Sequence, residues 1–475
     1  MRRKSKIALG AILSFAALSW IGVERLTSRT LDAEYFGLSP TRTANGRAIE
    51  PERLGGSDYC GNCHRQIFHE WNSSLHHFSS FNNAVYRRVA LDVERRRGSE
   101  MLKFCAGCHD PVALVAGQLP IERLNQWSAN AGITCLACHR ISEVHGGNGA
   151  YTISAPVLNA TLLTDRQWLQ PLHGAALAVA PSLHRRALSN PLYRTPEFCA
   201  TCHSLTSPRT VNGGGDLVLQ DEIGEMVRAH VGSGSKKNPG GCIDCHMPLV
   251  ASEDPTARRG LARSHRFSGG NNAIPHWNRD DAQLAATSSF LSTHKISVRC
   301  ESILGSSCPD ARAHRDRDID VTYLVRNVGV GHAFPAGTSE SNQAWVAIRV
   351  TDAVGRLVFE QDDPGTSAFK REFVDRWGRA TDRRNTATEA VALRSSSTLS
   401  PGQARALSYR FKTSAAAVFP LTITVKMNWR KYPESFLAWV SPGSPALVAP
   451  VVVLDSVTTT LQEAKLLEPT HETNH

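Results

Sequence analysis

Five short stretches of this sequence share one pattern: two cysteines separated by two residues, with a histidine directly after the second cysteine. The stretches begin at Cys60, Cys105, Cys135, Cys199 and Cys242. This pattern is typical of covalent haem attachment, in which the two thiols form thioethers with the haem vinyl groups. The adjacent histidine then supplies one axial bond to the iron. The sequence therefore predicts five covalently attached haem c groups.

Each predicted attachment site uses three side chains. The cysteines predicted to bind the cofactor are Cys60, Cys63, Cys105, Cys108, Cys135, Cys138, Cys199, Cys202, Cys242 and Cys245. The adjacent histidines predicted to bind iron are His64, His109, His139, His203 and His246. Structural zinc would pair two Cys-x-x-Cys units per ion and would not need a histidine after each. A thioredoxin-like motif would occur once. The repetition therefore favours haem.

The second axial ligand of each iron is also predicted to be histidine. The chain has 19 histidines and only five methionines. Two histidines per iron keep the reduction potential low, and six-coordinate iron reorganises little when it gains or loses an electron.

The first attachment segment resembles a known family. Residues Cys60 to His64, followed by Trp71, Ser74 and His76, are similar to the multihaem cytochrome family that includes the tetrahaem electron acceptor of hydroxylamine oxidoreductase. Related features are found in 132–145, 242–248 and 265–271, and the resemblance covers residues 57–340. It implies a multihaem c-type cytochrome, from which this chain departs by its fifth motif and its additional C-terminal region.

Five histidines are the predicted distal ligands: His76, His145, His184, His265 and His332. The resemblance points to His76, with His77 as the alternative, and to the segments that contain His265 and His332. His145 precedes two glycines, where the backbone can approach a porphyrin closely. His184 has His173 and His230 as rivals. The sequence does not assign any distal histidine to a particular haem.

The net charge of +10, from 53 basic and 43 acidic residues, does not predict a nucleic-acid partner. No nucleic-acid recognition motif accompanies the charge. Five haems would add about ten propionates, which could cancel the excess.

The N-terminus predicts export. Residues 1–26 form a signal or membrane anchor, with a basic start and an apolar run over 7–23. No small-x-small cleavage site follows, which favours an uncleaved anchor and a location in the periplasm. Cys300 and Cys308 lie outside the haem motifs, and such a space favours a disulfide between them. Residues 27–56 are predicted to be a linker.

The predicted fold class is α+β. Residues 57–295 are expected to form a pentahaem domain of short helices and loops, packed on porphyrin rather than on itself. Alternating, β-branched segments within 296–462 predict an antiparallel β-sandwich, and 463–475 a flexible tail.

Electron transfer between redox partner proteins is the predicted function. A membrane quinol oxidoreductase or other cytochromes are the expected partners. The alternative is an oxidoreductase that acts on a small nitrogen or sulfur species at one open-coordinate haem. No lysine-terminated motif variant occurs, and the likeness of all five motifs favours electron transfer.

Overall fold

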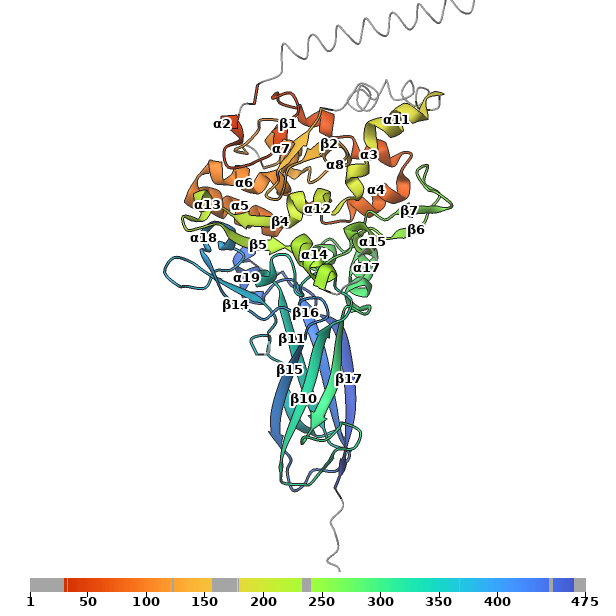
Figure 1. Cartoon of the computed structure of the whole chain (residues 1–475), viewed down its shortest axis with the longest axis vertical. Helices are drawn as coiled ribbons and strands as arrows, with labels where there is room; N and C mark the ends of the chain where they lie inside the picture. The colour runs from red at the N-terminus through yellow and green to blue at the C-terminus, as the bar shows by residue number, and fades with distance from the viewer. Residues whose placement is uncertain are drawn as a thin grey trace, which may run out of the picture.

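The structure is a computed structural model that describes residues 30–464, apart from 32, 122–123, 156–176, 178, 233–240, 367 and 444–446. Helices dominate as far as Ser292, and strands dominate from Ile296 onward. In Figure 1 the helical part lies above a long bundle of strands. The predicted α+β class is confirmed.

Short helices and loops form the N-terminal part. The helices are α2 (Ala33–Phe36), α3 (Ser57–Gly61), α4 (Arg65–Asn72), α5 (Ala84–Arg97), α6 (Ser99–His109), α7 (Pro111–Val115), α8 (Cys135–His139), α11 (Pro181–Leu188), α12 (Pro196–His203), α13 (Arg209–Asn212), α14 (Glu222–Gly232), α15 (Cys242–His246), α16 (Ala273–Trp277) and α17 (Asp281–Ser292). Three small sheets lie among them: β1 (Arg42–Thr43), β3 (Tyr151–Ile153) and β2 (Ile141–Val144); β4 (Ser204–Ser207) and β5 (Leu217–Asp221); and β6 (Leu249–Ala251) and β7 (Leu261–Arg263).

This part has a hydrophobic core of its own, so the prediction that it packs only on porphyrin was wrong. All five residues of α7 are buried, and the last four pack with Leu102 and Leu136 in one cluster. The segment predicted to be a linker contributes to this core, because Phe36 and Leu54 are fully buried in it. A chain segment whose apolar side chains are buried in this way is held to the domain.

Two larger antiparallel sheets form the C-terminal part. One has the order β15 (Ala404–Lys412), β10 (Asp318–Asn327), β8 (Ile296–Ile303). The other has the order β12 (Leu357–Gln361), β11 (Gln343–Thr351), β16 (Leu421–Arg430), β17 (Val452–Glu463), β9 (Arg312–Ala313), in which only β9 runs parallel to its neighbour. Alternate residues of β10 are buried, as a strand with one face on a core requires.

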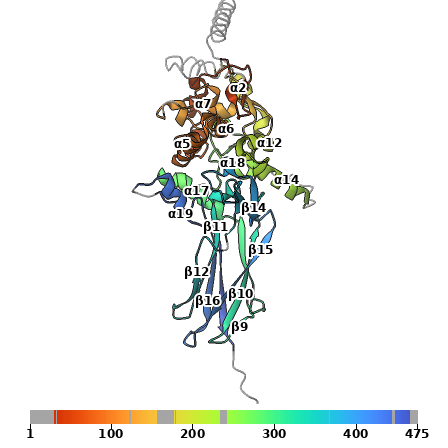
Figure 2. The ribbon, with the colours of Figure 1, turned by 90° about the vertical axis from the view of Figure 1, so that its left-hand side faces the viewer.

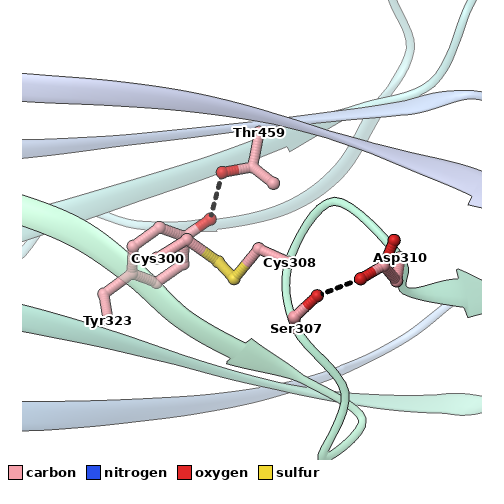
Figure 3. Close-up of a disulfide and its surroundings, with 6 residues drawn as sticks. All are labelled: Cys300, Ser307, Cys308, Asp310, Tyr323 and Thr459. Atoms are coloured by element: carbon pink, nitrogen blue, oxygen red, sulfur yellow. Dashed lines mark hydrogen bonds between the residues drawn. A yellow bond between two sulfur atoms is a disulfide. The ribbon is translucent and has the colours of Figure 1, made fainter.

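The two sheets share one core. Tyr323 of β10 is fully buried between them, and its hydroxyl lies 3.3 Å from Oγ1 of Thr459 on β17. Beside it, Cys300 and Cys308 form the expected disulfide, which confirms that prediction (Figure 3).

The C-terminal part also contacts the helical part directly. The hairpin β13 (Arg371–Val374) and β14 (Ala392–Ser396), with α18 (Thr386–Glu389), extends from the sheets toward the helices (Figure 2). An Nη1 of Arg97 donates to the carbonyl of Thr388 at 3.1 Å. Helix α19 (Glu434–Val440) packs Phe436 and Leu437 near Val85 of α5.

The predicted anchor (1–26, with its apolar run 7–23) and nearly all of the predicted tail lie outside the described residues. Within the residues described, none of the helices has both the length and the apolar character that a membrane span needs.

Candidate haem-binding sites

Four of the five motifs lie at the end of a helix. Helices α6, α8, α12 and α15 each end at the histidine of a motif. In the first motif, α3 ends at Gly61 and α4 begins at Arg65, so His64 lies between them. Residues three and four positions apart share one helix face. The helical turn therefore directs the two thiols and the imidazole of a motif to the same side.

Polar groups fix the first turn of several of these helices. The Oγ1 of Thr134 accepts a hydrogen bond from the N–H of Ala137 at 3.0 Å. The carboxylate of Asp244 accepts one from the N–H of Gly241 at 2.9 Å. A short helix has few internal hydrogen bonds, so such caps contribute to its stability.

The imidazoles next to the cysteines are held through Nδ1. The Nδ1 atoms of His109, His139 and His246 lie 2.9, 2.8 and 2.7 Å from the backbone carbonyls of Ser79, Leu188 and Ser268. Nδ1 of His64 lies 3.1 Å from a carboxylate oxygen of Asp254, whose side chain is fully buried. A proton held on Nδ1 leaves Nε2 free to bind a metal.

Four pairs of imidazole rings face each other across a gap. The pairs are His64 with His184 (ring centres 6.3 Å apart), His76 with His203 (6.3 Å), His139 with His265 (6.5 Å) and His246 with His332 (6.4 Å). Because a metal–imidazole bond is about 2 Å long, two rings that share one metal ion have their centres about 6 Å apart. The four gaps therefore fit one iron each.

Each facing pair joins a motif histidine to a predicted distal ligand. The structure brings His76, His184, His265 and His332 opposite four different motif histidines, an assignment that the sequence left open. Burial lowers the pKa of His76 to about 3 and that of His265 to about 4. Both imidazoles are therefore neutral at pH 7, which is the form that binds metals.

The structure gives no support to His145 as a ligand. The ring of His145 is exposed, and its Nε2 lies 2.8 Å from Oγ1 of Thr152. The two glycines after it serve a different purpose, because a Cβ on Gly147 would lie 2.4 Å from the carbonyl oxygen of Ser204. These glycines were expected to allow a close approach to a porphyrin, but the group that Gly147 approaches is the backbone of Ser204.

Of the rival histidines only the side chain of His77 is described, and it contributes no facing pair. His77 stacks on Trp71 with ring centres 4.6 Å apart, and its Nδ1 lies 2.8 Å from the carbonyl of Asn72. His173 and the side chain of His230 lie outside the described residues.

His109 differs from the other motif histidines. Among the residues that the structure describes, no second imidazole faces it at such a distance. Tyr86 stacks on the ring of His109 instead, with centres 4.4 Å apart, and donates a hydrogen bond from its hydroxyl to Asp110. Tyr86 is thus a packing partner of His109.

Neighbouring motifs contact one another through their cysteines. Three pairs of thiols from different motifs lie near enough to affect each other's ionisation: Cys60 with Cys135, Cys108 with Cys202, and Cys199 with Cys242. Burial and the nearby Cys135 and Cys202 raise the pKa of Cys138 to about 12, so the third and fourth motifs also lie close together. The five motifs therefore form a continuous set.

Two buried carboxylates that position histidines were not found from the sequence. Besides Asp254, Glu70 of α4 accepts hydrogen bonds from Oγ of Ser264 at 2.9 Å and from the N–H of His265 at 2.7 Å. Nothing in the local sequence distinguishes these carboxylates, because their partners are distant along the chain.

The comparisons with known proteins find a match for part of the sequence and a similar fold. Residues 59–140 match the family model described as cytochrome c554 and c-prime. A penta-heme cytochrome c552 from Thermochromatium tepidum has a similar fold, with a TM-score of 0.58 and 19% sequence identity over 87% of this chain and 100% of that one. None of the curated proteins compared with the chain matches it.

Two other solved structures each cover about a third of this chain and resemble it too weakly to carry an argument. They are the sporulation control protein Spo0M from Bacillus subtilis (TM-score 0.15, 9% identity, 36% of this chain and 49% of that one) and the C-terminal domain of wzt (TM-score 0.17, 10% identity, 36% and 72%). Residues 59–140 are thus similar to a c-type cytochrome family, and the chain shares its fold with a penta-heme cytochrome.

Proposed function

We propose that this protein transfers electrons between redox partners in the periplasm through five covalently attached haem c groups. The observation that carries the proposal is the set of four imidazole pairs, each with a gap that fits one iron. Iron held by two histidines keeps both axial bonds through a redox cycle, so little must reorganise. When bound, the haems supply the one-electron chemistry.

The thiol contacts support a path between the haems. A thioether attaches each haem by its vinyl edge, so contacting thiols place two such edges side by side. The first motif adjoins the third, and the third adjoins the fourth. The fourth motif then adjoins both the second and the fifth. Cys63 and Cys245, in the first and fifth motifs, are exposed. We assign electron exchange with partner proteins to these two ends.

The proposed partners are a membrane quinol oxidoreductase or other cytochromes. The disulfide between Cys300 and Cys308 supports a location outside the cytoplasm. Anchoring by residues 7–23 belongs to the proposal. So does the division into a pentahaem domain over 57–295 and a β-sandwich over 296–462.

Holoprotein from a host that attaches haem c provides the test. Intact mass should show five haems, and EPR of the ferric protein should show four low-spin irons with two histidine ligands each. A fully matured protein with four or fewer haems would overturn the count. High-spin signals from several haems would overturn the pairing.

A second candidate function is a redox enzyme acting on a small nitrogen or sulfur species. The specific observation is His109, which no imidazole faces among the described residues. An iron with a free axial position can bind a small molecule, whereas an iron with two histidines cannot. A fifth, high-spin signal in the same EPR spectrum would support this candidate.

A further inference from the structure

One of the four facing imidazole pairs differs from the others in the angle between its rings. Three pairs are nearly parallel, with ring planes 10°, 18° and 7° apart: His64 with His184, His139 with His265, and His246 with His332. The pair of His76 and His203 is twisted, with ring planes 51° apart at a centre distance like that of the other pairs. An iron at the fourth motif would therefore be bound by two imidazoles of different orientation.

Phe267 is the aromatic residue that contacts the twisted pair. It packs on the ring of His76 with ring centres 4.0 Å apart and planes 52° apart. Aromatic rings usually pack with their centres about 4.5–7 Å apart, so this contact is closer than most. Phe267 also contacts His265, edge to face and at 5.5 Å, and the pair that contains His265 is twisted by only 18°. The twist is therefore larger at the pair that Phe267 contacts more closely.

Hydrogen bonds hold the rings of two other distal histidines but not that of His76. The Nδ1 atoms of His265 and His332 lie 3.0 and 2.9 Å from backbone carbonyls. Within the part of the chain that the structure describes, neither ring nitrogen of His76 forms a hydrogen bond. The torsion that turns an imidazole about its Cβ–Cγ bond has only broad minima. Packing by Phe267 therefore sets the angle of this ring.

The backbone is held on both sides of Phe267. Nη1 of Arg266 donates to Oε1 of Gln283 at 3.0 Å, and Nε2 of Gln283, which is buried on α17, donates to the carbonyl of Arg266 at 3.1 Å. On the other side, the carbonyl of Ser268 lies 2.7 Å from Nδ1 of His246. Phe267 itself has a φ of 48°, a left-handed conformation that is rare for a bulky residue. Such a conformation persists only where its surroundings fix it.

We propose that Phe267 is a positioning residue that keeps the ring of His76 twisted against that of His203. The twist gives the haem attached at Cys199 and Cys202 an electronic structure unlike those of the other three haems with two histidines. This role rests on the proposed function, because it requires a haem with two histidine ligands at the fourth motif.

The angle between two axial imidazoles acts on the d orbitals of the iron. Each ring raises the energy of the d orbital that overlaps its π system, so parallel rings raise one orbital and separate it from the other. Twisted rings raise both orbitals more equally, and a low-spin ferric iron then has a larger maximum g value in its EPR spectrum. The smaller separation also stabilises the ferric state less, so the reduction potential is higher. Groups that orient a metal ligand tune the metal in this way.

The first test is the EPR spectrum of the ferric holoprotein. Three low-spin signals of similar shape are expected from the near-parallel pairs, and one low-spin signal with a larger maximum g value from the twisted pair. His76→Ala should remove that signal, which assigns it to the fourth motif. Four similar low-spin signals, or a large-g signal that survives His76→Ala, would overturn the role of Phe267 and leave the electron-transfer proposal intact. High-spin signals from several haems would overturn both.

The second test changes Phe267 itself. In Phe267→Ala the ring of His76 is free to turn, so the large maximum g value should fall toward that of the other three signals while the iron stays low-spin. The potential of that haem alone should fall in a redox titration followed by EPR. Phe267→Tyr, which keeps the aromatic ring, should retain the wild-type signal. An unchanged large-g signal in Phe267→Ala, or conversion of that iron to high-spin, would contradict the proposal.

Phe290 of α17 provides a matched control. It is half-buried like Phe267 and packs on His246 with ring centres 5.5 Å apart, but the pair that contains His246 is nearly parallel. Phe290→Ala should therefore leave the large-g signal unchanged. Loss of that signal in both alanine variants would mean that it responds to any loosening of the packing around the haems, and the specific role of Phe267 would be wrong.

Discussion

Asp254 is a buried carboxylate that controls one histidine of a haem motif. It lies in the loop between β6 and β7 and contacts Nδ1 of His64. Burial opposes its ionisation, but hydrogen bonds from Thr256 and His64 outweigh burial and lower the pKa of Asp254. The remaining motif histidines with a described Nδ1 contact face neutral carbonyls. Of these histidines, His64 would therefore be the most electron-rich ligand to a haem attached as proposed.

We expect Asp254→Asn to raise the reduction potential of a single haem. Without the negative charge, the ferric state is less stable relative to the ferrous state. Each tenfold change in the equilibrium constant between the two states raises a one-electron potential by about 59 mV. Spectroelectrochemical titration would show one component moving upward while four stay in place. Glu253→Gln, at an exposed neighbouring carboxylate, should leave all five unchanged. A drop in potential, or a shift of every haem, would contradict this role.

At the scale of elements, the sequence predicted the strands better than it predicted which histidines face each other. The alternation in β10, β15 and β16 marks one buried face, and the structure has strands at these places. The hairpin strand β14 is exposed along its whole length, so no hydrophobic period reveals it. The motif residues follow from local spacing alone. Their partners do not, because only the tertiary fold brings His184 to His64 or His332 to His246.

The disulfide loop between β8 and β9 is expected to stabilise the two sheets. Closing a loop with a sequence separation of eight residues restricts the unfolded chain and contributes about 2.5 kcal/mol. Replacing both Cys300 and Cys308 with serine should therefore lower the Tm of the C-terminal part by roughly 5–10 °C in calorimetry.

A control separates the disulfide from the rest of its loop. Ser307→Ala removes the hydrogen bond between Ser307 and Asp310 (Figure 3) and should have a much smaller effect. Wild-type protein treated with reductant should reproduce the Tm of the double variant. An unchanged Tm in both cases would show that the sheets hold the loop without the covalent link.

At the scale of the whole molecule, His332 joins the two parts. It lies between β10 and β11 in the C-terminal part, yet its ring faces His246 at the end of α15. Its Nδ1 lies 2.9 Å from the carbonyl of Ala333, which leaves Nε2 for the gap. Glu225 of α14 accepts a hydrogen bond from the N–H of Ala333 at 2.8 Å and holds the loop in place.

His332→Ala should convert one low-spin iron to high-spin, or give it a replacement ligand with a changed potential. Integration of the EPR spectrum should show three low-spin irons with two histidine ligands where the wild type has four. His314→Ala, at an exposed histidine of the same part, is the matched control. An unchanged spectrum in folded His332→Ala protein would mean that the C-terminal part only packs against the haem domain.

The order of the thiol contacts makes the fourth motif a junction. With haems attached as proposed, the third, second and fifth all adjoin the haem of Cys199 and Cys202. Every path for electrons between the two exposed ends includes that haem. The haem of His109 adjoins only that haem, so electrons that pass between the ends do not need it. Loss of the haem of the fourth motif would divide the haems into three separate groups. Loss of the haem of the second motif would leave the path between the two ends intact. Electron transfer through the molecule is therefore most sensitive to loss of one haem, that of the fourth motif.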